Sequence, residues 1–298
     1  MEAGMKYYPS LAEAVEAVCG MPVKVTGMAP VSGGDINLSY IITLSDGSRM
    51  FMKENKADRS DMFLKEAEGL EAIRKSGSIS VPAVYAYGCD GSNSFLLMEY
   101  IQPAKQRDDY YEELGRNLAE MHKAECGSYV GNGRYGFSAD NYIGAGAQEN
   151  TPGESWIGFF RDRRLIPQIK RAEGYFGKTE MKMIDRLLEK LDDILVEPER
   201  PSLVHGDLWY GNVITGNDGK AWLIDPAVYV GHAEADIAMT ELFGGFPKRF
   251  YESYFETNKL AAGYEERRDI YNLYHLMNHL NLFGGGYYYE VMSIISRY

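Results

Sequence analysis

A change of hydrophobic pattern near Ile101 constrains the fold of this chain more than any other sequence feature. Before Ile101, short β-branched and aromatic runs alternate with turns rich in Ser, Asp and Gly. After it, apolar residues recur mainly at the three- and four-residue spacing of helices. We therefore expect an α+β fold of two lobes, a small β-rich lobe over residues 1–101 and a larger, mainly helical lobe over residues 102–298.

The first lobe is predicted to contain an antiparallel sheet of five strands. The order is three strands, a helix and two strands, preceded by a helix over residues 11–18. The strands are expected at 23–31, 38–44, 50–53, 84–88 and 95–100, and the helix at 61–74. The turn at 45–48, Ser-Asp-Gly-Ser, is typical of a hairpin between antiparallel strands.

The second lobe is predicted to be helical around one short β-like insert. Helices are expected at 111–123, 156–170 (interrupted near Pro167), 180–195 and 270–283. The insert covers residues 203–225 and includes the polar turn Gly-Asn-Asp-Gly at 216–219.

Composition excludes several kinds of partner. The chain has 31 Lys and Arg against 43 Asp and Glu, a net charge of −12, and no basic patch that would favour nucleic acid or an anionic membrane. No run approaches the roughly 18 apolar residues of a membrane span, and no secretion signal is evident. Three widely spaced cysteines, Cys19, Cys89 and Cys126, suggest reduced thiols. We expect a cytoplasmic protein of open oligomeric state, with a monomer favoured.

The segment that carries most chemistry is LVHGDLWYGNV, residues 203–213, followed by WLIDP at 222–226. It places Asp207, Asn212 and Asp225 in the order and spacing that phosphoryl transfer from ATP requires. Asp207 would orient or deprotonate the attacking hydroxyl, while Asn212 and Asp225 would supply oxygen ligands to Mg²⁺. The spacing from Asp207 to Asn212 equals that of the protein-kinase catalytic loop, with Gly206 in place of its Arg. Ordinary turn, cap and strand-end roles explain each residue singly but not the ordered set.

Upstream residues complete a nucleotide site in the expected order. Lys53 on the third strand could reach phosphates, and Glu66 on the next helix could hold Lys53 in an ion pair, although a solvated helix charge is the alternative for Glu66. Gly33 and Gly34 are expected in a loop that covers the phosphates. The backbone of Glu99 and Ile101, after the fifth strand, is expected to bind the adenine edge.

Several segments resemble the fructosamine kinase (ketosamine 3-kinase) family, within the wider group of aminoglycoside phosphotransferase-like kinases. They are HGDLWYGN at 205–212, IDPA at 224–227, GHAEADIAM at 231–239, WIGFFRDRRLIPQ at 156–168 and YNLYHLMNHLNLFGG at 271–285. The catalytic pattern is shared by the wider group, whereas the last two segments are specific to the family. The similarity runs from about residue 23 to the end of the chain.

This resemblance implies a protein-kinase-like fold and ATP- and Mg²⁺-dependent phosphorylation of the 3-hydroxyl of ketosamines. The substrate would be a ribulosamine or fructosamine, free or protein-bound, and the product would decompose to release the amine, a deglycation repair step. Many family members carry a Cys in the glycine loop, associated with a bridged dimer. Asp35 takes that place here, so disulfide-linked regulation is not expected.

Other polar and aromatic residues are candidates for the substrate side. Trp209 could pack on a sugar or its linker, with core packing as the alternative. His275 and Asn278 could line a pocket, and a metal site at His275 and His279 lacks a third ligand. Asp236 resembles a residue that supports the catalytic loop, with an N-cap as the alternative. Three further charges, Arg161, Arg163 and Arg164, are expected on a solvated helix face.

Two other functions remain open from sequence. A kinase for another hydroxylated amine, such as an aminoglycoside or choline, would have the same catalytic residues. A catalytically dead kinase-like binding module is disfavoured, because Lys53, Asp207, Asn212 and Asp225 are all present. The interval from Asp225 to Asp236 is too short for the activation segment of a protein Ser/Thr kinase.

Overall fold

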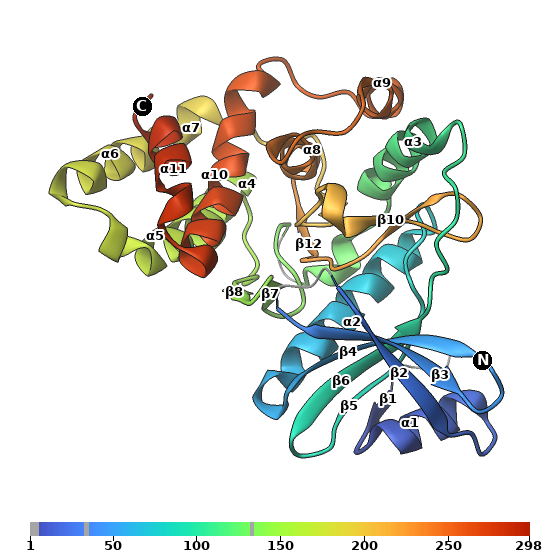
Figure 1. Ribbon diagram of the computed structural model, residues 1–298. Helices are drawn as coiled ribbons and strands as arrows, with labels where there is room; N and C mark the ends of the chain where they lie inside the picture. The colour runs from blue at the N-terminus through green and yellow to red at the C-terminus, as the bar shows by residue number, and fades with distance from the viewer. Residues whose placement is uncertain (1–5, 33–35, 132–133) are drawn as a thin grey trace. The chain divides into compact units, whose positions relative to one another are not determined.

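A computed structural model describes residues 6–32, 36–131 and 134–298 (Figure 1). Its internal contacts divide the chain into two units. Unit 1 comprises residues 1–108 and 214–225, and unit 2 comprises residues 109–213 and 226–298. The expected α+β class is confirmed, with a sheet in unit 1 and mostly helices in unit 2.

Unit 1 is built on a six-stranded sheet with the strand order β1-β5-β6-β4-β3-β2. Its strands are β1 (Lys6–Tyr8), β2 (Val25–Val31), β3 (Leu38–Leu44), β4 (Arg49–Lys56), β5 (Val84–Cys89) and β6 (Asn93–Glu99). The five predicted strands are present and pair antiparallel. The sequence missed β1, which pairs parallel with β5, because three residues are too few to show a two-residue alternation.

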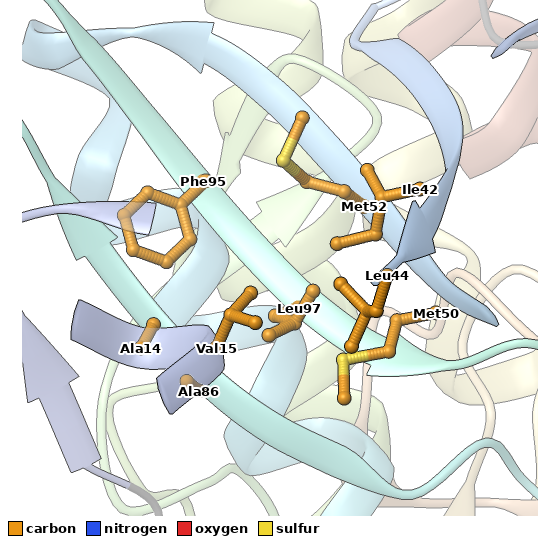
Figure 2. Packing of buried hydrophobic residues seen from close by; sticks show 9 residues of the cluster. All are labelled: Ala14, Val15, Ile42, Leu44, Met50, Met52, Ala86, Phe95 and Leu97. Carbon is orange, nitrogen blue, oxygen red and sulfur yellow. The ribbon is translucent and has the colours of Figure 1, made fainter. Parts of the chain in front are cut away.

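Alternation along the strands of this sheet produces two apolar faces. On one face, side chains from β3, β4, β5 and β6 pack with helix α1 (Leu11–Cys19), as Figure 2 shows. This cluster consists of Ala14, Val15, Ile42, Leu44, Met50, Met52, Ala86, Phe95 and Leu97. Residues next to them in the strands, such as Lys53 and Leu96, belong to the other face because successive side chains of a strand alternate.

Helix α2 (Ser60–Ser76) contacts strands β5 and β6 and follows β4 through a single 3-10 turn, η1 (Ala57–Arg59). It buries Phe63, Ala67, Leu70 and Ile73 at the predicted spacing of four and three residues. The helix ends at Gly77, whose φ of 69° is the left-handed conformation of a C-cap. The connection is short, so Glu66 on α2 is brought close to Lys53 on β4.

A distant hairpin joins unit 1 through backbone hydrogen bonds. Strands β10 (Val213–Thr215) and β11 (Ala221–Leu223) pair with each other. The Leu223 amide donates to the Ser80 carbonyl at 2.9 Å, and the Arg107 amide donates to the Gly219 carbonyl at 3.1 Å. The end of β11 leads to Asp225, which therefore belongs to unit 1 although it lies far along the chain.

Unit 2 is mainly helical, with two short strand pairs. Its longer helices are α3 (Tyr110–Lys123), α6 (Lys178–Glu189), α8 (Ala233–Leu242), α9 (Lys248–Thr257), α10 (Tyr264–Phe283) and α11 (Tyr288–Ile295). Shorter ones are α4 (Trp156–Phe160), α5 (Ile166–Arg171), α7 (Leu191–Ile194) and the 3-10 turns η2 (Gly127–Tyr129), η4 (Glu173–Tyr175), η5 (Tyr210–Asn212) and η6 (Gly285–Tyr287). The strand pairs are β7 (Asn141–Ile143) with β8 (Gly146–Gln148), and β9 (Ser202–Val204) with β12 (Tyr229–Gly231).

The predicted interruption near Pro167 is placed differently in the structure. Between α4 and α5 the chain forms a π-helical turn, η3 (Arg161–Leu165), and Pro167 lies in the first turn of α5. A proline in the first turn breaks no helical hydrogen bond, so it is compatible with a helix beginning there. The predicted helix at 180–195 is also divided, into α6 and α7.

No helix in the described part of the chain is long and apolar enough to cross a membrane.

We predict that Leu97→Ala destabilises unit 1 by about 2–5 kcal/mol, because Leu97 is fully buried in the cluster of Figure 2 and truncation leaves a cavity. Leu38→Ala is the matched control, since Leu38 is 61% exposed, and it should change the free energy of unfolding by less than about 0.5 kcal/mol. Urea unfolding of the two variants measures the difference, and equal effects would contradict the packing described.

Candidate active site

Lys53 lies between two carboxylates in unit 1. Its Nζ is 2.6 Å from Glu66 Oε1 and 2.5 Å from Asp225 Oδ1, and the residue is only 6% exposed. Burial of the ammonium lowers its pKa, but the charges of Asp225 and Glu66 outweigh burial, so the pKa of Lys53 lies above its ordinary value. The ion pair with Glu66 is the one the sequence predicted, and the solvated alternative for Glu66 is wrong.

The three charges of this group do not balance when all are ionised, since one ammonium faces two carboxylates. Burial raises the pKa of the Glu66 carboxyl, Lys53 opposes this effect, and the charge of Asp225 adds to it. The side chain of Asp225 is 46% exposed, whereas that of Lys53 is 7% exposed. An additional cation next to Asp225 would therefore relieve the excess negative charge, and carboxylate oxygen is a ligand that Mg²⁺ prefers. Asp225 fits the predicted metal role.

Asp225 has an unusual backbone. It follows β11 with a φ of 55°, and among the described residues other than glycine it alone has a positive φ. Asp tolerates this left-handed conformation better than most residues, at a cost of order 1 kcal/mol. The residue with this backbone conformation is also the one whose side chain forms the ion pair with Lys53.

The second group of predicted catalytic residues lies in unit 2. After Asp207 the chain makes the 3-10 turn η5, which brings Asn212 back toward it. The Asn212 amide nitrogen donates to the Asp207 carbonyl at 2.8 Å and to its Oδ2 at 3.2 Å. The amide nitrogen is thus engaged with Asp207, which leaves the Asn212 side-chain oxygen as the atom suited to a metal.

Asp236 supports the loop that carries Asp207. Its carboxylate accepts hydrogen bonds from the backbone amides of His205, at 2.7 Å, and Gly206, at 2.9 Å. The side chain of His122 is 3.1 Å from the same carboxylate through Nε2 and 2.7 Å from the Tyr254 hydroxyl through Nδ1. Burial raises the pKa of Asp236, but His122 and the backbone donors outweigh burial, so the pKa is lowered.

The N-cap alternative for Asp236 is wrong. The cap of α8 is His232, whose ring nitrogen accepts from the Glu234 amide. Gly206, which replaces the Arg of the protein-kinase pattern, has a φ of 82°, and a Cβ there would collide with the Ala227 carbonyl oxygen. The loop therefore requires glycine at this position.

The predicted nucleotide-side residues are described only in part. Gly33 and Gly34, and the neighbouring Asp35, lie outside the described residues. Glu99 ends β6, and its amide donates to the Ala83 carbonyl at 2.8 Å. This hydrogen bond engages the Glu99 amide with the protein. Ile101 follows, half-buried, in a segment without regular structure.

The predicted substrate-side residues are all in unit 2 and differ in exposure. Trp209 is 38% exposed and places its ring edge to face with Phe243, so the core-packing alternative is wrong. His275 is buried, and burial lowers its pKa to about 3. Asn278 is also buried, and its side-chain oxygen accepts from Gln168 at 3.1 Å.

The expectation of a solvated Arg164 is wrong. The residue is fully buried, with its guanidinium 4.0 Å from the ring centre of Tyr229 and 4.7 Å from that of Phe159. It donates to the Asn150 side chain at 2.7 Å and to the Glu149 carbonyl. Helical spacing offered a signal, because Arg164 lies four residues after the buried Phe160. Arg161 and Arg163 are partly exposed.

Sequence reasoning also missed a buried set of amides that holds the chain just after Asp225. Asn141 donates to the Val228 carbonyl at 2.7 Å, and Gln148 donates to the Ala227 carbonyl at 2.9 Å. Asn150 connects this pair to Arg164. The partners lie about 80 residues apart in sequence, so no local pattern could have revealed the contacts.

Comparison with solved structures defines the class first. An aminoglycoside phosphotransferase, APH(2'')-Ib in its ADP-bound form, superimposes with a TM-score of 0.60 at 18% identity, covering 96% of this chain and 97% of the other. A type I macrolide 2'-phosphotransferase does so with a TM-score of 0.60 at 18% identity, covering 95% and 94%. The fold is therefore that of the antibiotic phosphotransferases and related kinases.

The family follows from closer matches. The fructosamine kinase family model matches residues 7–298. A "Probable ketoamine kinase" of Synechocystis is 36% identical over 97% of this chain and 96% of its own, and a "Protein-ribulosamine 3-kinase, chloroplastic" of Arabidopsis thaliana is 39% identical over 94% and 84%. A "Putative fructosamine-3-kinase" structure from Haemophilus somnus has a TM-score of 0.87 at 30% identity, covering 97% and 96%. This chain belongs to the fructosamine kinase family.

We predict that unit 2 loses stability in acid through buried neutral histidines. Burial lowers the pKa of His275 to about 3 and that of His232 to about 4, both below the ordinary value of about 6.5. The contribution of these histidines to the free energy of unfolding is therefore fully present above about pH 6.5 and is lost as the pH falls toward 4. The loss amounts to at most about 1.4 kcal/mol per pH unit for each histidine. The free energy of unfolding measured at pH 7.5, 6.5 and 5.5 checks this.

His275→Gln is the matched variant, since it removes one of the two titrating groups. Its unfolding free energy should fall less steeply with acidity than that of the wild type. The same slope in both proteins would contradict the assignment of a neutral His275.

Proposed function

We propose that this protein is a ketosamine 3-kinase, which transfers the γ-phosphoryl group of ATP to the 3-hydroxyl of a ribulosamine or fructosamine. The observation that supports the proposal is the Lys53 ammonium held between Glu66 and Asp225, because phosphoryl transfer uses a cation for the phosphates and a carboxylate for the metal. Membership of the fructosamine kinase family supports the substrate class.

The residues of the two units have separate roles in this proposal. Unit 1 supplies Lys53 for the phosphates, with Glu66 holding it, and Asp225 as a metal ligand. Unit 2 supplies Asp207, which accepts the proton of the substrate hydroxyl, and Asn212, which offers its side-chain oxygen to the metal. Bound Mg²⁺ would neutralise charge on the transferring phosphates.

The remaining nucleotide contacts belong to the same proposal. In this proposal Gly33 and Gly34, which lie outside the described residues, contribute backbone amides to the phosphates, and the backbone of Glu99 and Ile101 binds the adenine edge. The amide of Glu99 is engaged by Ala83, so the Glu99 carbonyl and the Ile101 amide are the atoms for adenine. Several fold neighbours were solved with nucleotides, among them LicA with AMP.

The physiological setting is proposed on the same grounds. The substrate is a free or protein-bound ketosamine, and phosphorylation leads to release of the amine. The three thiols Cys19, Cys89 and Cys126 are unpaired, which suits a reducing compartment such as the cytoplasm, and we favour a monomer.

We predict that Asp207→Asn lowers kcat by about 10²–10⁴-fold with little change in the KM for ATP, because the amide cannot accept the hydroxyl proton. Asp185→Asn is the matched control, since Asp185 is exposed on α6, and it should retain full activity. A coupled ADP-release assay with a ribulosamine measures both. Full activity of Asp207→Asn would overturn the role of this residue.

We also predict that Lys53→Met lowers kcat/KM for ATP by at least about 100-fold, because it removes the cation placed for the phosphates. Glu66→Gln should have a smaller effect in the same direction, since it keeps Lys53 but weakens the ion pair that holds it.

The substrate panel for the wild type should include ribulosamines, fructosamines, an aminoglycoside and choline. Phosphorylation of only the last two would favour a kinase for another hydroxylated amine.

A further inference from the structure

A connected series of aromatic rings begins two residues after Asp207. Trp209 meets Phe243 edge to face at 6.0 Å, and Phe243 stacks on His279 at 4.9 Å with an interplanar angle of 9°. His279 in turn contacts Phe283 at 5.4 Å and Tyr287 at 5.0 Å. We call these five residues the aromatic strip, and all of them belong to unit 2.

Two rings of the aromatic strip are exposed to solvent, and the rings between them are half-buried. Trp209 is 38% exposed and Phe283 is 51% exposed, whereas Phe243 and His279 between them are half-buried. Exposed aromatic side chains are ordinary when they are scattered singly. Here the two exposed rings are joined through the ring contacts of Phe243 and His279, which restrict the positions they can take.

The charge of the aromatic strip favours a cation with an apolar body. Burial lowers the pKa of His279, so its ring is neutral at physiological pH. The faces of Trp, Phe and Tyr carry partial negative charge and attract ammonium groups. The net charge of −12 adds no repulsion against a cationic ligand.

The strip also starts where the reaction is proposed to occur. Two residues of chain span at most about 7 Å, so Trp209 cannot lie far from Asp207. Helix α10, which carries His279 and Phe283, also carries Tyr274, whose pKa is raised by burial with a smaller contribution from the Asp207 charge. In a ketosamine, four bonds separate the 3-oxygen from the amine nitrogen, about 5 Å when extended.

We infer that the aromatic strip binds the amine half of the substrate, namely the protonated secondary amine and the aliphatic chain that carries it. This inference rests on the proposed function. The Trp209 face takes the ammonium nearest the reacting sugar, and Phe283 takes the outer part of a long carrier such as a lysine side chain. The ligand class is therefore a cationic ketosamine with an extended apolar carrier, rather than a compact one.

The test compares two carriers in the wild type and in three variants. The substrates are Nα-acetyl-Nε-ribulosyl-lysine, with a long carrier, and N-ribulosyl-methylamine, with a short one. Phe283→Ala should raise the KM for the lysine substrate about three- to tenfold with kcat retained, because it removes the apolar surface for the carrier, and the loss should be clearly smaller for the methylamine substrate. Trp209→Leu should weaken both.

Tyr289→Leu is the matched control, because Tyr289 is 81% exposed and its recorded ring contact is with Tyr288, outside the aromatic strip. It should leave both KM values unchanged. Equal losses for the two carriers in Phe283→Ala, or no loss for either, would overturn the inference while leaving the kinase assignment intact. A wild type that phosphorylates neither substrate would instead overturn the proposed function itself.

Discussion

The salt-bridged group of Lys53, Glu66 and Asp225 is the interaction on which the organisation of unit 1 depends. It joins a strand, the helix after that strand and a hairpin that returns from more than 150 residues later. A buried lysine without partners would lose its charge, whereas two carboxylates keep Lys53 ionised. The alternation that buries Met52 in the α1 cluster also turns Lys53 to the opposite face, so core packing and site geometry have one origin.

In unit 2, buried side chains hold the loop that carries Asp207, which has little regular structure of its own. Asp236 binds two successive amides of that loop, and His122 and Tyr254 hold Asp236 from behind. Buried polar groups of this kind are stable only when they are satisfied, and here each link is a hydrogen bond. The helices that supply them are α3, which carries His122, α8, which carries Asp236, and α9, which carries Tyr254, all labelled in Figure 1.

Local chemistry explains which parts could be predicted. Strand alternation and turn residues predicted five of the six strands of the sheet in unit 1. The ordered motifs predicted Lys53 with Glu66 and Asp207 with Asn212, because each pair is close in sequence or typical of a known family. The parallel strand β1 was too short to detect. The hydrogen bonds of Asn141 and Gln148 to residues 227–228 join segments distant in sequence, for which a single sequence contains no signal. For the burial of Arg164 the sequence offered only its helical spacing from Phe160, and the ring of Tyr229 that it contacts comes from a distant segment.

The central claim is that phosphate is transferred to one hydroxyl of a ketosamine. The most direct test is phosphorus and carbon NMR of the product formed from ATP, Mg²⁺ and Nα-acetyl-Nε-ribulosyl-lysine with purified protein. The account predicts a single phosphate ester on the 3-oxygen of the sugar, formed in a one-to-one ratio with ADP. A phosphate on another hydroxyl, or ADP formed with inorganic phosphate and unmodified ketosamine, would contradict it.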